Sequence, residues 1–286
     1  MQKSMAIRAT LVSIVANAAL LAIKGAATYF SDSLVIFSET LNSLSDVAAA
    51  LAILGCVYWA WQSPDESHPF GHRRAEPVAG LIVAIFTGIL GFEVCRQAVA
   101  DLWASEHSEH IGSAPIVALL ITAVVKTAMT SYFNLRARQL HSPAFRATAI
   151  DCRNDVLIAV QGLIAVFLAR YEMPFLDTLA ALLVGGYIFY SAYGIGIENI
   201  DYLMGKAPDA DLLRDIRRSA ESVPGIVEVD AIKAHYVGTF VHVELTVRVD
   251  GALPTVESHA LAEDARYAVE LLPMIDRAFV HIEPVH

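Results

Sequence analysis

The chain has 286 residues, of which 56% are hydrophobic and 17% charged, and its mean hydropathy is +0.51. A soluble domain is nearer about 45–50% apolar and about 25% charged, so the composition indicates a membrane protein. The net charge of −10 argues against a nucleic-acid-binding protein, which would present a basic face. The three cysteines form no CxxC pair, which argues against a disulfide scaffold or a thiolate zinc site.

Six stretches are apolar and long enough to cross a bilayer, which takes about 20 residues per helix. They cover approximately residues 6–30, 33–62, 75–103, 113–137, 144–170 and 174–200. The first residues lack the cleavage region of a signal peptide, so we interpret the first stretch as a retained helix. The sequence therefore predicts a six-helix transmembrane domain over residues 1–204 and a second domain over residues 205–286.

Lysines and arginines gather on one side of the predicted membrane domain. They are Lys3, Arg8, Arg73, Arg74, Arg136, Arg138, Arg146 and Lys206. The positive-inside rule places that side in the cytoplasm. We therefore expect an integral protein of a bacterial inner membrane with both termini cytoplasmic.

Two predicted spans carry polar side chains four residues apart: Asn42 and Asp46 in the second, and Asp151 and Asp155 in the fifth. Residues at this spacing share one helical face, so two facing helices would offer four ligands to one cation. Each Asp near the bilayer centre costs about 2.5–3.5 kcal/mol, and intramembrane acids are functional by default. The alternative is that these carboxylates pair with an arginine such as Arg153 or lie at helix ends.

Two further polar features lie in or near the spans. Glu39 shares a helical face with Asn42 and Asp46, and is either an auxiliary ligand or proton relay, or a solvated residue nearer the membrane surface. Glu93 and Arg96 are spaced to form a structural ion pair.

The loop after the second span carries a carboxylate and two imidazoles at short intervals, in Asp65, His68 and His72. Ligands of this type and spacing suit a zinc-like ion.

The remaining residues predict a small α+β domain. Helices are expected over 209–222 and 255–272, and strands over 226–236, 240–250 and 278–283. The middle strand alternates apolar and polar side chains, as a half-buried strand does, and Gly238–Thr239 predicts a hairpin turn before it.

Three motifs, NSLSD in the second span, HPFGHRRAE in the next loop and DCRND in the fifth span, resemble the cation diffusion facilitator family. The resemblance covers nearly the whole chain. It implies a secondary active transporter, not an enzyme: a homodimer in the lipid bilayer that exchanges cytoplasmic divalent metal ions for protons. It also implies that the C-terminal domain has a ferredoxin-like, metallochaperone-like αββαβ fold.

The resemblance also implies metal ligands, position by position. They are Asn42, Asp46, Asp151 and Asp155 for transport, Asp65, His68 and His72 in the loop, and Asp230, Glu244, His259, His281 and Glu283 in the C-terminal domain. We add His242, because strand alternation places it on the face of Glu244. His235 and His286 are weaker candidates.

The chain departs from zinc-selective members of the family, which commonly carry a histidine where this chain has Asn42 and Asp151. An oxygen-only site favours manganese or iron, whereas the general affinity order favours zinc, so the metal stays open among Zn, Mn, Fe, Co and Cd. Asp230 and Glu244 likewise replace histidines of well-known zinc members. In the family, a basic residue after the loop histidine pairs with an acidic residue after the sixth span near the dimer interface. Arg74 occupies the basic position in this chain, but Gly205 occupies the acidic position.

Two other functions fit the residues less well. A membrane-anchored metal sensor or scaffold would act through the C-terminal domain and leave three buried acids without a purpose. A membrane metallohydrolase would need an open coordination position for an activated water.

Overall fold

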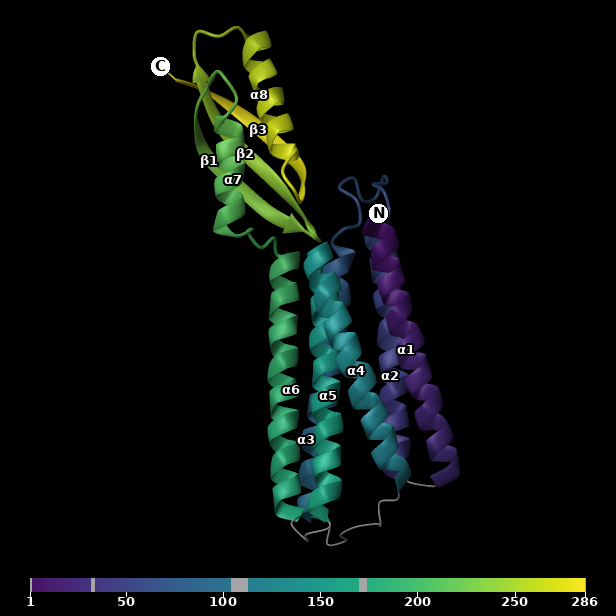
Figure 1. Cartoon of the computed structure of the whole chain (residues 1–286). Coiled ribbons are helices and arrows are strands. Elements are labelled where there is room, and N and C mark those ends of the chain that lie inside the picture. Colours follow the sequence, from purple (N-terminus) through teal and green to yellow (C-terminus); the bar gives the residue numbers. More distant parts are fainter. Residues whose placement is uncertain (1, 32–33, 104–112, 170–173, 286) are drawn as a thin grey trace. The chain divides into compact units, whose positions relative to one another are not determined.

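The structure is a computed structural model that describes residues 2–31, 34–103, 113–169 and 174–285 (Figure 1). The chain divides into two compact units, residues 1–200 and residues 201–286.

The first unit is built from long helices, the last of which continues into the second unit. They are α1 (Gln2–Ser31), α2 (Leu34–Ala60), α3 (Ala75–Trp103), α4 (Ser113–Leu140), α5 (Pro143–Ala169) and α6 (Pro174–Leu203). Among the described residues, α1, α2, α3, α4 and α6 are apolar and long enough to cross a membrane. Helix α5 is of similar length and carries Asp151, Arg153 and Asp155 in its first half.

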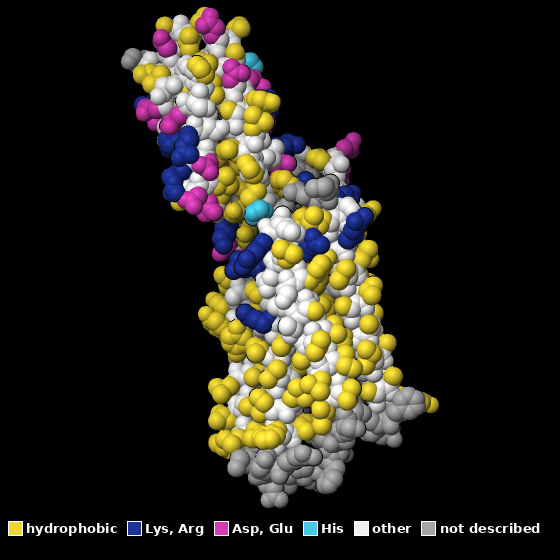
Figure 2. Space-filling model, in the orientation of Figure 1, with side chains coloured by type: hydrophobic (Ala, Val, Ile, Leu, Met, Phe, Trp, Pro, Cys, Tyr) yellow, Lys and Arg dark blue, Asp and Glu magenta, His cyan; other side chains and the backbone are white. Residues whose placement is uncertain are grey.

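The helices pack through small side chains. Helix α4 lies along α5 and α1 along α2, and α3 contacts both α2 and α5. Ala9, Ala79 and Ala144 are buried in the core around the stacked rings of Phe133 and Phe145. Small residues let helix backbones approach closely where lipid removes the hydrophobic drive to associate. Many other large apolar side chains point outward, and Figure 2 shows hydrophobic side chains spread over the visible helical surface.

Helices α3 and α6 meet at two glycines. A Cβ added to Gly91 would lie 2.8 Å from the backbone nitrogen of Phe189, and one added to Gly185 would lie 2.6 Å from Sγ of Cys95. Any larger residue at these positions would force the two helices apart.

The second unit follows the order αββαβ. It contains α7 (Ala210–Glu221), β1 (Ile226–Val237), β2 (Phe240–Asp250), α8 (Thr255–Glu270) and β3 (Ile275–Val285). The sheet order is β1-β2-β3, with β1 antiparallel and β3 parallel to β2. A helical membrane domain followed by a small α+β domain is the predicted fold class, which is thereby confirmed.

The core of the second unit lies between the sheet and its two helices. Val243 and Leu245 of β2 are buried with Ile216 of α7 and Val269 of α8. The alternate residues of β2, which include Glu244, lie on the opposite, open face of the sheet. The hairpin turn falls where predicted, with Gly238 at a φ of 65°. The last strand is longer than expected, because β3 pairs with β2 from Ile275 onward.

Candidate functional site

Three carboxylates from α2 and α5 converge inside the helical unit. Ligand oxygens of Asp46, Asp151 and Asp155 all lie within 4.8 Å of one another. The α5 pair is placed by the helical repeat, which brings residues four apart onto one face. The structure therefore brings these three predicted ligands together.

A small cavity of about 30 Å³ adjoins two of these carboxylates, Asp46 and Asp151. Its lining includes Asn42, Asp46 and Asp151, and also Asn17 of α1 and Lys126 of α4. A space of this size holds about one water molecule or one small ion. The predicted fourth ligand, Asn42, thus lines the same space as the acids.

The acids have a cationic partner that the sequence analysis did not anticipate. Nζ of Lys126 donates a 2.7 Å hydrogen bond to Oδ2 of Asp46 and lies 2.5 Å from Oδ2 of Asp155. The side chain of Lys126 is only 2% exposed. Arg153, the partner considered from the sequence, instead places its guanidinium over the ring of Tyr187 on α6. A lone lysine in an apolar span is the signal that would have identified Lys126.

One further polar contact, and two buried oxygens that accept no hydrogen bond from the described residues, complete the cluster. Thr87 of α3 donates a 2.5 Å hydrogen bond to Oδ1 of Asp151. Oδ2 of Asp155 is in contact with Nζ of Lys126, whereas the buried Oδ1 of Asp155 accepts no hydrogen bond from the described residues. The same is true of the amide oxygen of Asn17. Buried oxygens without donors are costly, so each of these oxygens is available to a cation or to a new hydrogen-bond donor.

The loop ligands also come together. Oδ1 and Oδ2 of Asp65 lie 3.3 Å from Nδ1 of His68 and Nε2 of His72, respectively. Gly71, at a φ of 80°, makes the turn that returns His72 toward Asp65. The hydroxyl of Ser67 and the backbone N–H of His68 donate to Asp65 and hold the pKa of its carboxyl below the ordinary value.

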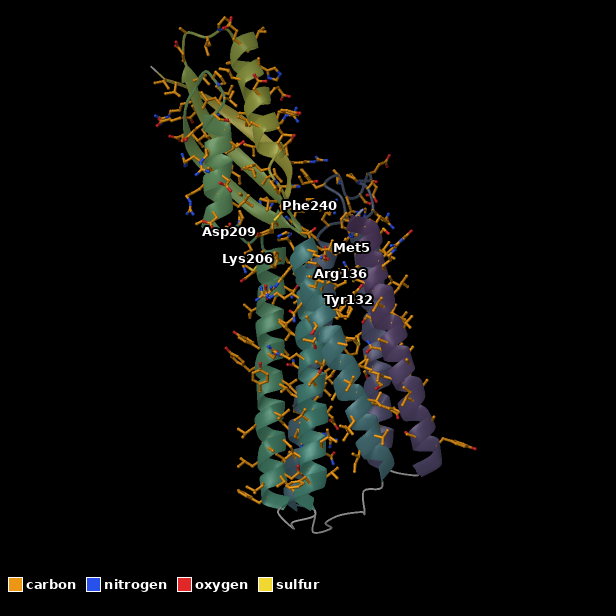
Figure 3. All side chains as sticks on the ribbon, viewed as in Figure 1. Met5, Tyr132, Arg136, Lys206, Asp209 and Phe240 are labelled. Atoms are coloured by element: carbon orange, nitrogen blue, oxygen red, sulfur yellow. The ribbon has the colours of Figure 1, made fainter. Side chains whose placement is uncertain are left out.

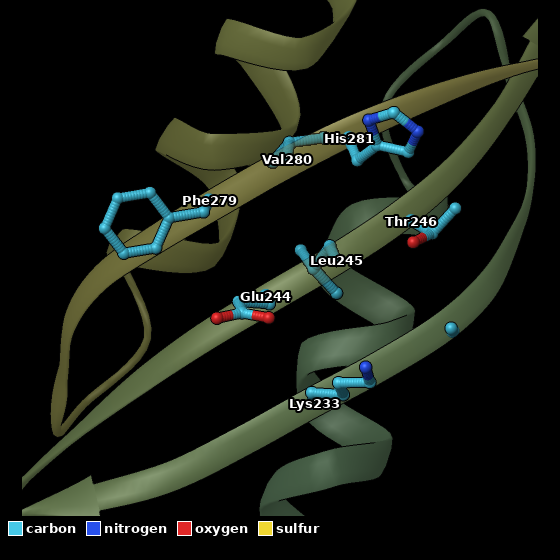
Figure 4. Close-up of a pocket in the computed structure, with 8 residues that line it drawn as sticks. Lys233, Glu244, Leu245, Thr246, Phe279, Val280 and His281 are labelled. Carbon is cyan, nitrogen blue, oxygen red and sulfur yellow. The ribbon is translucent and has the colours of Figure 1, made fainter.

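The C-terminal candidates are spread over the second unit. Glu244 and His281 line a hollow on the open face of the sheet (Figure 4). Asp230 pairs with Arg248 at 2.9 Å, while His259 projects from α8. Because α8 covers the other face, His259 does not share the open face with Glu244.

His242 has a partner other than the one its strand position suggests. Its Nε2 lies 3.3 Å from Oδ2 of Asp276, and its ring packs edge-on against His235. Glu283 follows His281 along β3 by two residues and so lies on the same face. Among the described residues, the transport and loop clusters are the groups of three metal-ligating side chains.

Two other expectations concern α2 and α3. Arg96 donates to Glu93 through Nε at 2.8 Å, which confirms the predicted structural pair. The side chain of Glu39, like residue His286, lies outside the described part of the structure.

Family models match both units of the chain. The model of the cation efflux transmembrane domain matches residues 10–204, and that of the cation efflux protein cytoplasmic domain matches residues 208–285. The chain belongs to the cation efflux family. This membership confirms the resemblance to cation diffusion facilitators and makes the chain an integral membrane protein of a metal-transporting family.

Relatives of this cation efflux protein align along most of their length. An uncharacterized transporter of Methanocaldococcus jannaschii is 32% identical over 96% of this chain and 97% of its own. The manganese efflux system protein MneS of Bacillus subtilis is 29% identical, with 96% and 94% covered. The cation-efflux pump FieF of Serratia proteamaculans is 31% identical, with 93% and 87% covered.

Proposed function

We propose that this cation efflux protein exports a divalent metal ion in exchange for protons, with Asp46, Asp151 and Asp155 as its transport site. The observation that carries the proposal is the convergence of these acids, whose ligand oxygens lie within 4.8 Å of one another. Oxygens about 2.0–2.2 Å from a metal ion are at most about 4.4 Å apart. The cluster therefore needs only a small contraction to hold an ion, and Asn42 supplies a neutral oxygen from the same cavity.

Coupling to protons follows from the ligand type. A carboxylate must lose its proton before it binds metal, so metal ions and protons compete for one site. In an alternating-access cycle, the site takes metal from the cytoplasm, and proton entry from the other side releases it. The protein is then a secondary active transporter.

The ligand set favours a hard metal. Asn42 and the three aspartates offer oxygen alone, which suits manganese or iron better than a site containing imidazole does. The name of the Bacillus subtilis relative, a manganese efflux system protein, points the same way. We place manganese and iron ahead of zinc, cobalt and cadmium.

We propose that the protein works as a homodimer in a bacterial inner membrane, with both termini in the cytoplasm. Met5 near the N-terminus and Arg136 near the end of α4 lie at the same end of the helices (Figure 3). The lysines and arginines at this end support its cytoplasmic placement. The candidate ligands of the C-terminal domain, among them Asp230, Glu244 and His281, would bind metal as a regulatory ligand.

The test is metal-driven proton flux in proteoliposomes, with Zn, Mn, Fe, Co and Cd each supplied under an imposed pH gradient. Asp46→Asn and Asp155→Asn should each abolish flux, while Glu93→Gln, which removes an acid from the surface pair on α3, should retain it. Wild-type flux in either aspartate variant would rule out this site. Metal binding without flux in the wild-type protein would favour the sensor or scaffold.

A further inference from the structure

Lys126 joins the two helices that carry the acids. It lies in α4, yet its ammonium contacts Asp46 of α2 and Asp155 of α5 at 2.7 Å and 2.5 Å. A lysine this deeply buried is costly unless its charge is compensated, and these carboxylates compensate it. The Lys126 ammonium thus neutralises the negative charge of Asp46 and Asp155, as a bound metal ion would.

The ammonium and a metal ion would compete for the same space. A metal ligated by Asp46 and Asp155 would lie about 2.0–2.2 Å from one oxygen of each. Nζ of Lys126 already lies between those two carboxylates, within 2.7 Å of each. Two cations that close together would repel strongly in a low-dielectric interior. Metal binding therefore requires the ammonium to leave.

The cavity offers the displaced ammonium a new acceptor. The amide oxygen of Asn17, on α1, is buried and accepts no hydrogen bond from the described residues. Asn17 and Lys126 line the same cavity, and α1 contacts α4. The long lysine stem can swing its head group between partners while its methylenes stay packed.

We infer that Lys126 is a tethered counter-cation: it occupies the acids of the metal-free site and swings to Asn17 when metal binds. This inference rests on the proposed transport site and names a residue that sets its affinity. By filling the empty site, the ammonium lowers apparent metal affinity and so favours release on the far side. If the ammonium leaves the acids free about 10% of the time, apparent affinity falls about tenfold.

The experiment measures Mn²⁺ binding to the full chain in lipid nanodiscs through the free Mn²⁺ signal in electron paramagnetic resonance. Only the binding that Asp155→Asn removes is counted, so the loop and C-terminal positions do not contribute. Lys126→Met should lower the Kd of this component about tenfold and reduce maximal flux, because the metal then leaves slowly. Lys126→Arg, which keeps the charge, should bind close to wild type.

Asn17→Leu tests the acceptor in a double-mutant cycle. In the wild-type background it should weaken Mn²⁺ binding, because the displaced ammonium loses its hydrogen-bond acceptor. In Lys126→Met it should have no effect, because that variant has no ammonium that could bind to Asn17. Weakening in both backgrounds would make Asn17 a direct ligand and overturn its role as acceptor.

The outcomes separate this inference from the proposed function. If Asp155→Asn leaves both binding and flux unchanged, the transport site itself is wrong. If Asp155→Asn abolishes binding while a folded Lys126→Met has an unchanged or higher Kd, only the counter-cation is wrong. If Lys126→Met does not fold, a metal-bound structure of the wild-type chain decides. Nζ must then lie beyond hydrogen-bond distance of Asp155, and an ammonium still in contact overturns the inference.

Discussion

The hydroxyl of Thr87 on α3 donates a 2.5 Å hydrogen bond to Oδ1 of Asp151 on α5. This contact fixes the orientation of a carboxylate that we propose as a metal ligand, and it ties a third helix to the site. Thr87 is fully buried, so the contact is shielded from water.

Thr87→Val should weaken Mn²⁺ binding about fivefold, because a net loss of about 1 kcal/mol is usual for one hydrogen bond. Thr87→Ser, which keeps the hydroxyl, serves as the matched control and should bind like the wild type. The measurement is the Kd for Mn²⁺ of the purified chain. Equal affinities in Thr87→Val and the wild type would mean that Asp151 needs no positioning from α3.

Asp151→His should shift metal preference toward zinc, because imidazole is a softer ligand than carboxylate. We expect the ratio of zinc to manganese flux to rise on the order of tenfold, or about 1.4 kcal/mol. Asp151→Glu retains an oxygen ligand and is the control for the change in side-chain size. An unchanged flux ratio in Asp151→His would show that ligand type does not set selectivity.

The loop cluster should lose metal as the pH falls through the range in which imidazoles protonate, because ligands must be deprotonated. Because the pKa of Asp65 lies below the ordinary value, its carboxylate is already ionised throughout the pH range in which imidazoles titrate. The carboxylate becomes protonated only when the pH falls below the usual range for an aspartate. Ser67→Ala, which raises the pKa of Asp65, should therefore leave the pH profile of Zn²⁺ binding unchanged between about pH 5.5 and 8. His72→Ala should remove loop binding. A shifted profile in Ser67→Ala would implicate Asp65 or His68, because the Ser67 hydroxyl also lies 3.1 Å from Nδ1 of His68.

Leu245→Ala should destabilise the C-terminal domain by about 2–5 kcal/mol, since Leu245 is 1% exposed and packs against α7 and α8. Phe279→Ala, on the open face of the sheet, is the control and should cost much less. Hydrogen exchange of residues 241–249 in the full chain measures the difference. Tryptophan fluorescence is unsuitable because Trp59, Trp61 and Trp103 all precede this domain.

The sequence was sufficient for features that depend on local spacing. The four-residue interval between Asp151 and Asp155, and the alternation along residues 240–250, each follow one regular repeat, so they predict a shared face. The αββαβ order was predictable because each element has its own pattern. The longer last strand was missed because pairing with β2, and not local composition, sets where β3 begins.

Features that depend on tertiary contacts were not predictable. Lys126 meets the acids only because α4 packs along α5 and α1 in the folded chain, and nothing in its own neighbourhood indicates which partner it takes. The pairing of His242 with Asp276 likewise depends on the register between β2 and β3. Strand alternation predicts a face for His242 but cannot identify its neighbour on the adjacent strand.

The glycine contacts between α3 and α6 bear on how the protein changes shape. Backbones pressed together at Gly91 and Gly185 leave no clearance for one helix to slide past the other. If the protein alternates access as proposed, we expect α3 and α6 to move as one pair and the rearrangement to fall on the other spans. Thr87 lies on α3, so its hydrogen bond to Asp151 would then link this pair to α5, a helix that we expect to move.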